Sequence, residues 1–217
     1  MKLVRYIYNN KTSFGHQASS DKIIDIGEKF NYESILDFIS ENSQGVTDYI
    51  NSDDALILDI SNIRILPPIK PRSLRDAYAF RQHVETSRKN RGLDMIQEFD
   101  NFPVYYYSNA EAVVGPGDIF IDDMFMNKLD FELEVAIVIG KEGVNIKSSE
   151  ADNYIGGFMI MNDFSARDLQ MQEMKLNLGP AKGKDFSTSL GPILVTPDEL
   201  QHNIKKTNNG YNYSLKM

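Results

Sequence analysis

The sequence predicts an α+β fold in which a small N-terminal α/β domain precedes a larger domain built on a mixed β-sheet. Strand-like apolar segments dominate the second half of the chain. They lack the regular alternation with helices that a doubly wound parallel sheet requires. Prolines cluster at positions 67, 68 and 71, where missing backbone donors favour an extended connection. We therefore predict domains over residues 1–68 and 69–217.

The N-terminal domain is predicted to contain strands around one helix. Residues 2–10 and 21–27 have the apolar content of strands. Residues 31–42 place Ile35, Phe38 and Ile39 at the spacing of one helix face. A further strand is expected between residue 52 and the prolines.

The larger domain is predicted to open with a helix over residues 73–92, with Ser73 as its N-cap and Gly92 as its stop. Strand-like segments follow, and the segment 163–174 is predicted to be a helix between two of them. The predicted strands cover residues 102–109, 117–121, 129–140, 154–163 and 190–196.

The end of the sequence is expected to be an incomplete part of this fold. Residues 208–210 signal a turn, and the start of an alternating strand follows before the chain stops at Met217. A strand normally pairs with another strand, and none follows. We expect either an edge strand or a C-terminally truncated part of a longer protein.

Composition excludes several functional classes. The absence of cysteine excludes disulfide scaffolds, thiolate zinc sites and cysteine nucleophiles. A net charge of -8 without a basic block argues against nucleic-acid binding. No apolar run approaches the ~20 residues of a membrane helix, and no signal peptide opens the chain. We therefore expect a cytoplasmic protein without membrane or nucleic-acid partners.

The predicted strand 129–140 carries acids in an unusual place. Alternation puts Asp130, Glu132 and Glu134 on one face, and Phe131 and Leu133 on the other. Three neighbouring acids repel each other, and burying them unpaired would be costly. They are either a solvated acidic face or one side of a cation site.

Two further segments favour the cation site. On the predicted helix 73–92, Asp76 and His83 are seven residues apart and would share a face, which suits a ligand beside a general base. Asp163 would stand at a helix start, aligned with Arg167 and Gln170. Taken alone, each pattern is also that of an ordinary surface helix or of an N-cap with an ion pair.

Together the segments offer four carboxylates: Asp76, Glu132, Glu134 and Asp163. Carboxylate-only ligation favours a hard cation, Mg²⁺ or Ca²⁺. The Gly-rich segment 179–192 does not match the phosphate-loop pattern, because Leu178 and Asp185 stand where Gly and Ser or Thr are required. Lys184 is therefore either a solvated loop lysine or an electrostatic clamp.

These segments resemble the fumarylacetoacetate hydrolase superfamily. The resemblance covers residues 73–200 and rests on five motifs in the family's order: DAYAFRQH, FPVYYYSN, LDFELEVAIVIG, MNDFSARDLQ and GKDFSTSLGP. It implies a mixed β-sheet roll, which this chain would leave incomplete at its C-terminus. The family's tendency to dimerise implies a homodimer.

The resemblance also implies a role for each matching residue. The four carboxylates correspond to the cation ligands, and His83 corresponds to the base that deprotonates the attacking water. Oxyanion-stabilising groups match at three positions: Arg167, Gln170 and Lys184.

Substrate contacts are implied at Tyr78 and Tyr106. Arg91, with Arg88 as the alternative, matches an arginine that holds a substrate carboxylate. Met174 replaces a second expected tyrosine, and the segment that supplies the glutamate orienting the histidine has no counterpart here.

The implied reaction is hydrolysis of a C–C bond in a dioxo acid, fumarylacetoacetate or an acylpyruvate, with His83 activating water and the cation stabilising the enolate. Three alternatives stay open. Two are decarboxylation of an oxaloacetate-type β-keto acid and isomerisation. The third is a non-catalytic truncated protein that binds metal or pairs with another subunit.

Overall fold

The computed structural model describes residues 1–41, 45–208 and 210–214. Its first part is an antiparallel sheet of five strands: β1 (Lys2–Tyr8), β2 (Lys11–Gln17), β3 (Lys22–Asp25), β4 (Ile57–Asp59) and β5 (Arg64–Leu66). Asn9 and Asn10 both have positive φ, which suits the tight turn between β1 and β2. Three short helices accompany this sheet: α1 (Gly27–Phe30), α2 (Ile35–Glu41) and α3 (Val46–Ile50).

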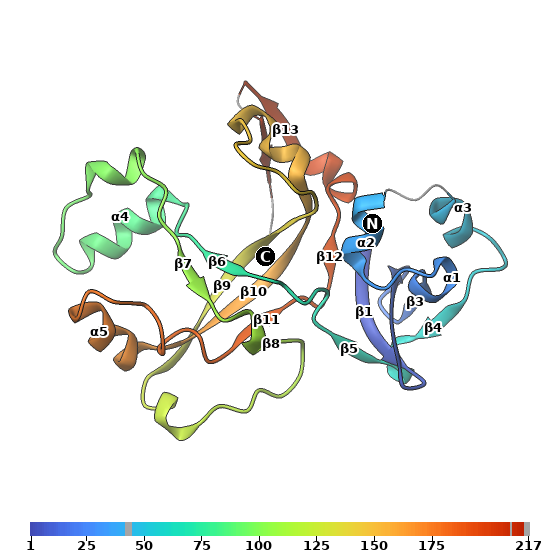
Figure 1. Cartoon of the computed structure of the whole chain (residues 1–217), viewed down its shortest axis with the longest axis horizontal. Coiled ribbons are helices and arrows are strands. Elements are labelled where there is room, and N and C mark those ends of the chain that lie inside the picture. Colours follow the sequence, from blue (N-terminus) through green and yellow to red (C-terminus); the bar gives the residue numbers. More distant parts are fainter. Residues whose placement is uncertain (42–44, 209, 215–217) are drawn as a thin grey trace.

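The second part is organised by two long antiparallel strands, β9 (Leu129–Ile139) and β10 (Ile155–Ala166). The other edge of β10 pairs with β11 (Thr188–Leu190) and β12 (Leu194–Val195), and β11 pairs in parallel with β8 (Val113–Val114). A separate ribbon of β6 (Leu74–Asp76) and β7 (Tyr106–Ser108) crosses β9 and β10 in Figure 1. The helices α4 (Arg81–Lys89) and α5 (Arg167–Lys175) lie at the left of that view.

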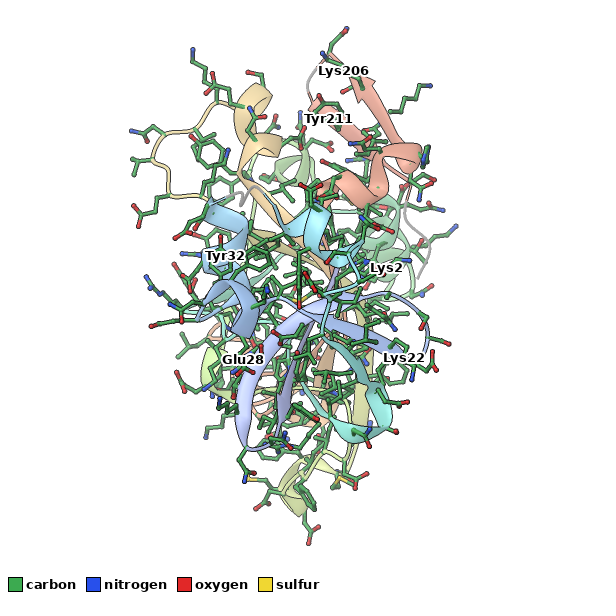
Figure 2. All side chains as sticks on the ribbon, turned by 90° about the vertical axis from the view of Figure 1, so that its right-hand side faces the viewer. Lys2, Lys22, Glu28, Tyr32, Lys206 and Tyr211 are labelled. Atoms are coloured by element: carbon green, nitrogen blue, oxygen red, sulfur yellow. The ribbon has the colours of Figure 1, made fainter. Side chains whose placement is uncertain are left out.

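Short 3-10 turns connect these elements, at Ile60–Asn62, Gln97–Asp100, Ala110–Ala112, Asp123–Phe125, Ser148–Tyr154 and Pro197–Asn203. The last elements form a hairpin of β13 (Ile204–Thr207) and β14 (Gly210–Tyr213). Figure 2 shows Lys206 and Tyr211 at the top of the molecule, with Lys22 and Glu28 projecting from opposite sides of the N-terminal part. The ring of Tyr213 packs on Phe158 with centroids 4.7 Å apart, which attaches the hairpin to β10.

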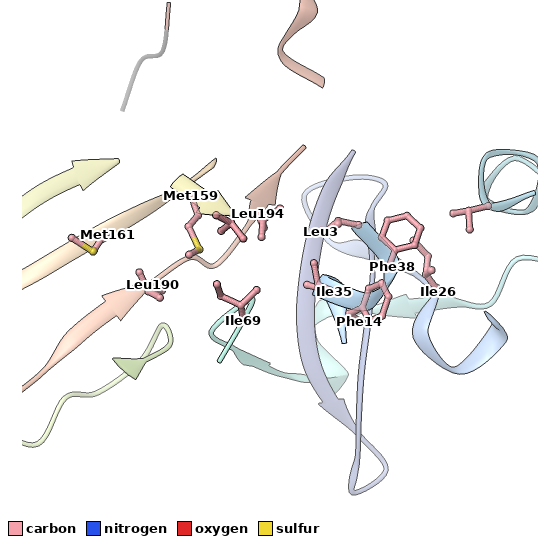
Figure 3. Close-up of a cluster of buried hydrophobic side chains, with 12 residues drawn as sticks. Leu3, Phe14, Ile26, Ile35, Phe38, Ile69, Met159, Met161, Leu190 and Leu194 are labelled. Carbon is pink, nitrogen blue, oxygen red and sulfur yellow. The ribbon is translucent and has the colours of Figure 1, made fainter. Parts of the chain in front are cut away.

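One sheet and one core join the two parts. Lys2 of β1 pairs with Val195 of β12, so the ten-stranded sheet runs from β4 through β1 to β10 and β8. The buried cluster in Figure 3 extends from Leu3 and Phe14 to Met161. The domain boundary near residue 68 stays a prediction, and the mixed α+β architecture is confirmed.

The predicted helix 73–92 is wrong in its first half. Residues 74–76 form β6, and the helix begins only at Arg81. Pairing of β6 with β7, some thirty residues along the chain (Asp76↔Tyr106), overrides the local helical signal. Asp76 and His83 therefore do not share a helix face.

Two other expected elements also differ, and a third agrees with one predicted alternative. Strand β10 continues to Ala166, so Asp163 lies inside a strand, not at a helix start. No strand forms over residues 117–121. The strand expected after residue 210 forms as β14, an edge strand that pairs with β13, which precedes it. Residue 42 of the predicted first helix and residues 215–217 of the terminal strand lie outside the described residues.

The apolar side of β9 does not face the core. Phe131, Leu133 and Ile137 are 60%, 49% and 54% exposed, whereas Val138 on the opposite face is buried. Within the described residues β9 pairs with β10 alone, so its other edge is open. Among the same residues no helix is both long and apolar enough to cross a membrane.

Burial predicts very different costs for two leucine truncations. Leu194 is fully buried in the cluster shared by both parts, so Leu194→Ala should lower the free energy of unfolding by about 2–5 kcal/mol. Leu133→Ala is the matched control, and it should cost less than about 1 kcal/mol. Urea unfolding of both variants checks this. Equal losses would contradict the burial of Leu194 or the exposure of Leu133.

Candidate active site

The two long strands place three acids on one face of the sheet. Asp163 on β10 lies directly opposite Glu132 on β9, and Glu134 lies opposite Met161. Directly opposed residues of an antiparallel pair share a face, so these three carboxylates point the same way. Alternation predicted this for the two glutamates. Glu132 and Glu134, two residues apart on β9, therefore form a row of acids beside Asp163.

The ribbon of β6 and β7 brings a further acid, Asp76, to these three. Asp76 and Tyr106 are opposed in that ribbon. The Tyr106 hydroxyl lies 2.8 Å from Asp76 Oδ2 and 2.7 Å from Asp163 Oδ2. A hydroxyl has one proton, so it donates to one carboxylate at a time. This contact ties the ribbon to the acid face of the sheet. Burial and the charges of Asp163 and Asp76 raise the pKa of Tyr106, which keeps its proton in place.

Asp76, Glu134 and Asp163 form a compact cluster of carboxylates, called the acid triad below. One oxygen of each lies within 4.8 Å of the others. Asp76 and Asp163 are buried, and Glu134 is half-buried. Burial and the neighbouring acids Asp76, Asp163 and Glu132 raise the pKa of Glu134 to about 8. Close carboxylates in a largely buried site favour either a shared proton or a cation.

The residues of the triad fit a hard divalent cation. Mg²⁺ and Ca²⁺ prefer oxygen ligands at about 2.0–2.6 Å, so oxygens within 4.8 Å of each other can share one ion. Asp163 Oδ1 is buried without a hydrogen-bond partner among the described residues, as a ligand atom would be. The donor set contains no sulfur or imidazole, which disfavours zinc and copper.

Glu132 belongs to a different set of contacts. Its Oε2 lies 2.7 Å from Lys184 Nζ, and its Oε1 accepts a hydrogen bond of 2.6 Å from Arg167. Burial acts to raise the pKa of Glu132, but Lys184 and Arg167 outweigh it and hold the pKa below its usual range. In this structure Glu132 pairs with two cationic side chains. The prediction that it is a fourth cation ligand stays a prediction.

Lys184 is a buried clamp between the two groups of acids. Its side chain is 2% exposed, and its ammonium lies 2.7 Å from Asp163 Oδ2 as well as from Glu132. Of the two sequence-based readings, the structure supports the clamp. Burial, followed by the charge of Asp76, raises the pKa of Asp163, and the Lys184 ammonium and the Tyr106 hydroxyl only partly oppose that shift.

Arg167 and Gln170 lie at the start of α5, next to the end of β10. The Arg167 guanidinium also contacts Asp130 Oδ2 at 2.8 Å and donates to Gln170 Oε1 at 3.1 Å. Sequence reasoning placed Asp130 in the acidic row but gave it no partner, and Arg167 is that partner. The alignment expected along a helix from Asp163 is absent, yet sheet pairing brings Arg167 to Glu132.

The other predicted site residues lie on α4 and its flanks. His83 is exposed on α4 and is not a member of the acid triad. Tyr78 is 48% exposed and stacks on Phe99 with centroids 6.0 Å apart. Arg91 donates to the backbone carbonyl of Ser87 at the end of α4. The roles implied for these three residues stay predictions.

Comparison with known proteins agrees with the motifs. The family model described as "Fumarylacetoacetate (FAA) hydrolase C-terminal" matches residues 73–213. The mitochondrial oxaloacetate tautomerase Fahd2a of Rattus norvegicus is 40% identical over 107 residues, which span 48% of this chain and 33% of that protein. The fumarylacetoacetate hydrolase domain-containing protein 2 homolog of Dictyostelium discoideum is 28% identical over 215 residues, spanning 92% of this chain and 66% of that protein.

A solved structure supports the fold. The fumarylacetoacetate hydrolase of Exiguobacterium antarcticum superposes with a TM-score of 0.70 at 24% identity, covering 94% of this chain and 69% of that one. The chain thus matches between a third and two thirds of the length of the two curated relatives. The family model covers well over half of the sequence, so the chain belongs to the fumarylacetoacetate hydrolase superfamily.

Proposed function

We propose that this chain acts on a small oxo acid through its enolate, and that keto–enol interconversion of an oxaloacetate-type acid is the reaction its site supports best. The observation that carries the proposal is the composition of the site. A cation site of three carboxylates, with Lys184 against it, suits enolate stabilisation. His83, the base that hydrolysis requires, is exposed on α4 and outside the acid triad. The likeness to an oxaloacetate tautomerase points the same way.

The acid triad would hold Mg²⁺ or Ca²⁺, which when bound polarises the oxygens of an oxo acid. The chain's own groups then have to move one proton between carbon and oxygen. Glu132 is held ionised by Lys184 and Arg167, so it can accept a proton. Lys184 can give a proton to the other reacting atom, after which the proton on Glu132 passes to Lys184 across 2.7 Å and restores both groups. Lys184 also contributes positive charge next to Asp163. In this proposal Glu132 transfers a proton and does not bind the cation.

Hydrolysis of a C–C bond in fumarylacetoacetate or an acylpyruvate is the second candidate. Oxyanion stabilisation needs donors that converge on one place. Arg167 contacts both Gln170 and Glu132, and Lys184 contacts Glu132 as well, so these three polar groups gather around one carboxylate, which favours hydrolysis. It also requires His83 to reach the reacting water. Tyr78, Arg91 and a homodimer belong to this proposal as substrate contacts and assembly.

A His83→Ala variant distinguishes the two reactions. It is assayed with enol-oxaloacetate, with fumarylacetoacetate and with an acylpyruvate, each in the presence of Mg²⁺ and again with EDTA. Ketonisation of enol-oxaloacetate should be abolished by EDTA and unchanged in His83→Ala, because no water is activated. Hydrolysis should fall about 10²–10⁴-fold in His83→Ala, the usual contribution of a general base. Gln82→Ala, an exposed neighbour on α4, is the control. Carbon dioxide release would identify decarboxylation.

Failure of the whole proposal has a clear signature. A folded sample whose melting temperature rises with Mg²⁺, but which turns over none of these substrates, would overturn both enzymatic candidates. That result would favour a non-catalytic metal-binding protein. Turnover that survives EDTA would instead reject the acid triad as the reaction's cation site.

A further inference from the structure

Glu173 lies in the last turn of α5, and no side chain three or four positions away along the chain offsets its negative charge. A negative charge near a helix C-terminus is unfavourable, because the macrodipole is negative there. The residues three and four positions away are Gln170, Leu176, Leu169 and Asn177, so no intrahelical ion pair compensates for it. Its partners come from the next segment of the chain.

The Glu173 carboxylate accepts three backbone hydrogen bonds from one turn. Oε2 accepts from the N–H groups of Ala181 and Gly183 at 3.0 and 3.2 Å, and Oε1 accepts from Lys182 N–H at 2.7 Å. Burial acts to raise the pKa of Glu173, but these three donors outweigh it and hold the pKa below its usual range. Charge-assisted hydrogen bonds of this kind are about twice as strong as neutral ones.

The same turn rests directly on α5 and on the end of β10. A Cβ added to Gly183 would lie 2.7 Å from the Gln170 backbone nitrogen, so only glycine permits this approach. The backbone N–H of Ala166 donates to the Gly183 carbonyl at 2.8 Å. The residue that follows the turn is Lys184, whose ammonium lies between Asp163 and Glu132.

We propose that Glu173 is a positioning residue, whose carboxylate fixes the turn 181–183 and thereby holds the Lys184 ammonium between Asp163 and Glu132. Glu173 acts on the site only through the backbone of this turn. A long lysine side chain has many rotamers, and fixing the backbone of the turn restricts the positions that the Lys184 ammonium can reach. The catalytic consequence rests on the proposed function of Lys184, whereas the placement does not.

The first test measures placement without activity. In the metal-free protein, Lys184 should react slowly with an amine-acylating reagent, because it is buried and paired. In Glu173→Gln, which loses the charge and turns an amide NH₂ toward N–H donors, the labelling rate of Lys184 read by mass spectrometry should rise about tenfold. Exposed Lys182 should be labelled at an unchanged rate. Gln172→Ala, an exposed neighbour on α5, is the control.

Two further variants keep the test decisive if Glu173→Gln is unstable. Gly183→Ala retains Glu173 but pushes the turn off α5, so it should expose Lys184 as well. Glu173→Asp keeps the charge and should restore part of the protection. Unchanged labelling of Lys184 in both Glu173→Gln and Gly183→Ala would overturn the inference.

Activity separates this inference from the proposed function. If wild-type protein is active, Glu173→Gln should lower kcat about tenfold with a smaller change in KM, because the substrate does not touch Glu173. If wild-type protein is inactive but Glu173→Gln exposes Lys184, the positioning role stands and the proposed function fails. A loss of activity with Lys184 still protected would reject positioning as the cause.

Discussion

Replacing Lys184 by Met should lower the free energy of unfolding of the metal-free protein by about 3–5 kcal/mol, the usual cost of breaking a buried ion pair. The ammonium is 2% exposed and lies 2.7 Å from both Asp163 and Glu132. Methionine fills much of the same volume but leaves two acids without their shared cation, next to Glu134 and Asp76. Urea unfolding in the presence of EDTA measures the loss.

Lys182→Met is the matched control for this variant. Lys182 is exposed on the same turn, and its contact with Glu173 is made by the backbone N–H, which the substitution retains. Its cost should stay within about 0.5 kcal/mol. Added Mg²⁺ should recover part of the loss in Lys184→Met, because a cation in the acid triad supplies positive charge. A cost for Lys184→Met as small as that of the control would show that Lys184 is solvated.

Alternation along one strand made the acid row predictable from sequence. The side chains of residues 130, 132 and 134 share a face whatever surrounds the strand, and the structure has them so. What alternation cannot distinguish is which of the acids join the triad. Glu134 joins it, whereas Glu132 pairs with Lys184 and Arg167, which lie 52 and 35 residues further along the chain.

The first half of the predicted helix 73–92 shows the opposite case, in which local pattern misleads. Ser73 followed by a mixed polar and apolar run is an acceptable helix start. The chain instead forms β6, because Asp76 pairs with Tyr106 and the Tyr106 hydroxyl reaches Asp163. That pairing depends on residues distant in sequence, so propensity alone could not reveal it. The same reason explains why His83 and Asp76 lie on different elements.

Glu173 was missed for a related reason, although a signal existed. A glutamate in the last turn of a helix opposes the macrodipole, and such a residue is a candidate for an outside partner. The nearby glycines at 179 and 183 signal a turn. Only the structure shows that the turn's N–H groups converge on this carboxylate.

Cation binding should strengthen with pH up to about 8. Burial and the neighbouring acids raise the pKa of Glu134 from 4.5 to about 8, so the metal-free fold favours its protonated form. The stability from this raised pKa is fully present below 4.5 and is lost as pH rises through 8. A cation needs the ionised form, so its apparent affinity should rise about tenfold per pH unit from pH 6 to 8 and then level off. Calorimetric titration with Mg²⁺ at several pH values measures this.

Glu134→Gln should remove both the binding and its pH dependence. Glutamine keeps the size of the side chain but cannot supply a charged ligand, so Mg²⁺ should no longer raise the melting temperature. Glu142→Gln, which removes one charge from an exposed acid outside the acid triad, is the control and should bind Mg²⁺ as the wild type does. The metal-free stability of Glu134→Gln should also fall less steeply between pH 6 and 8, because the titrating group is gone. Tight Mg²⁺ binding that is equal at pH 6 and pH 8 in the wild type would mean that Glu134 is not a ligand, and the cation would then have to sit elsewhere.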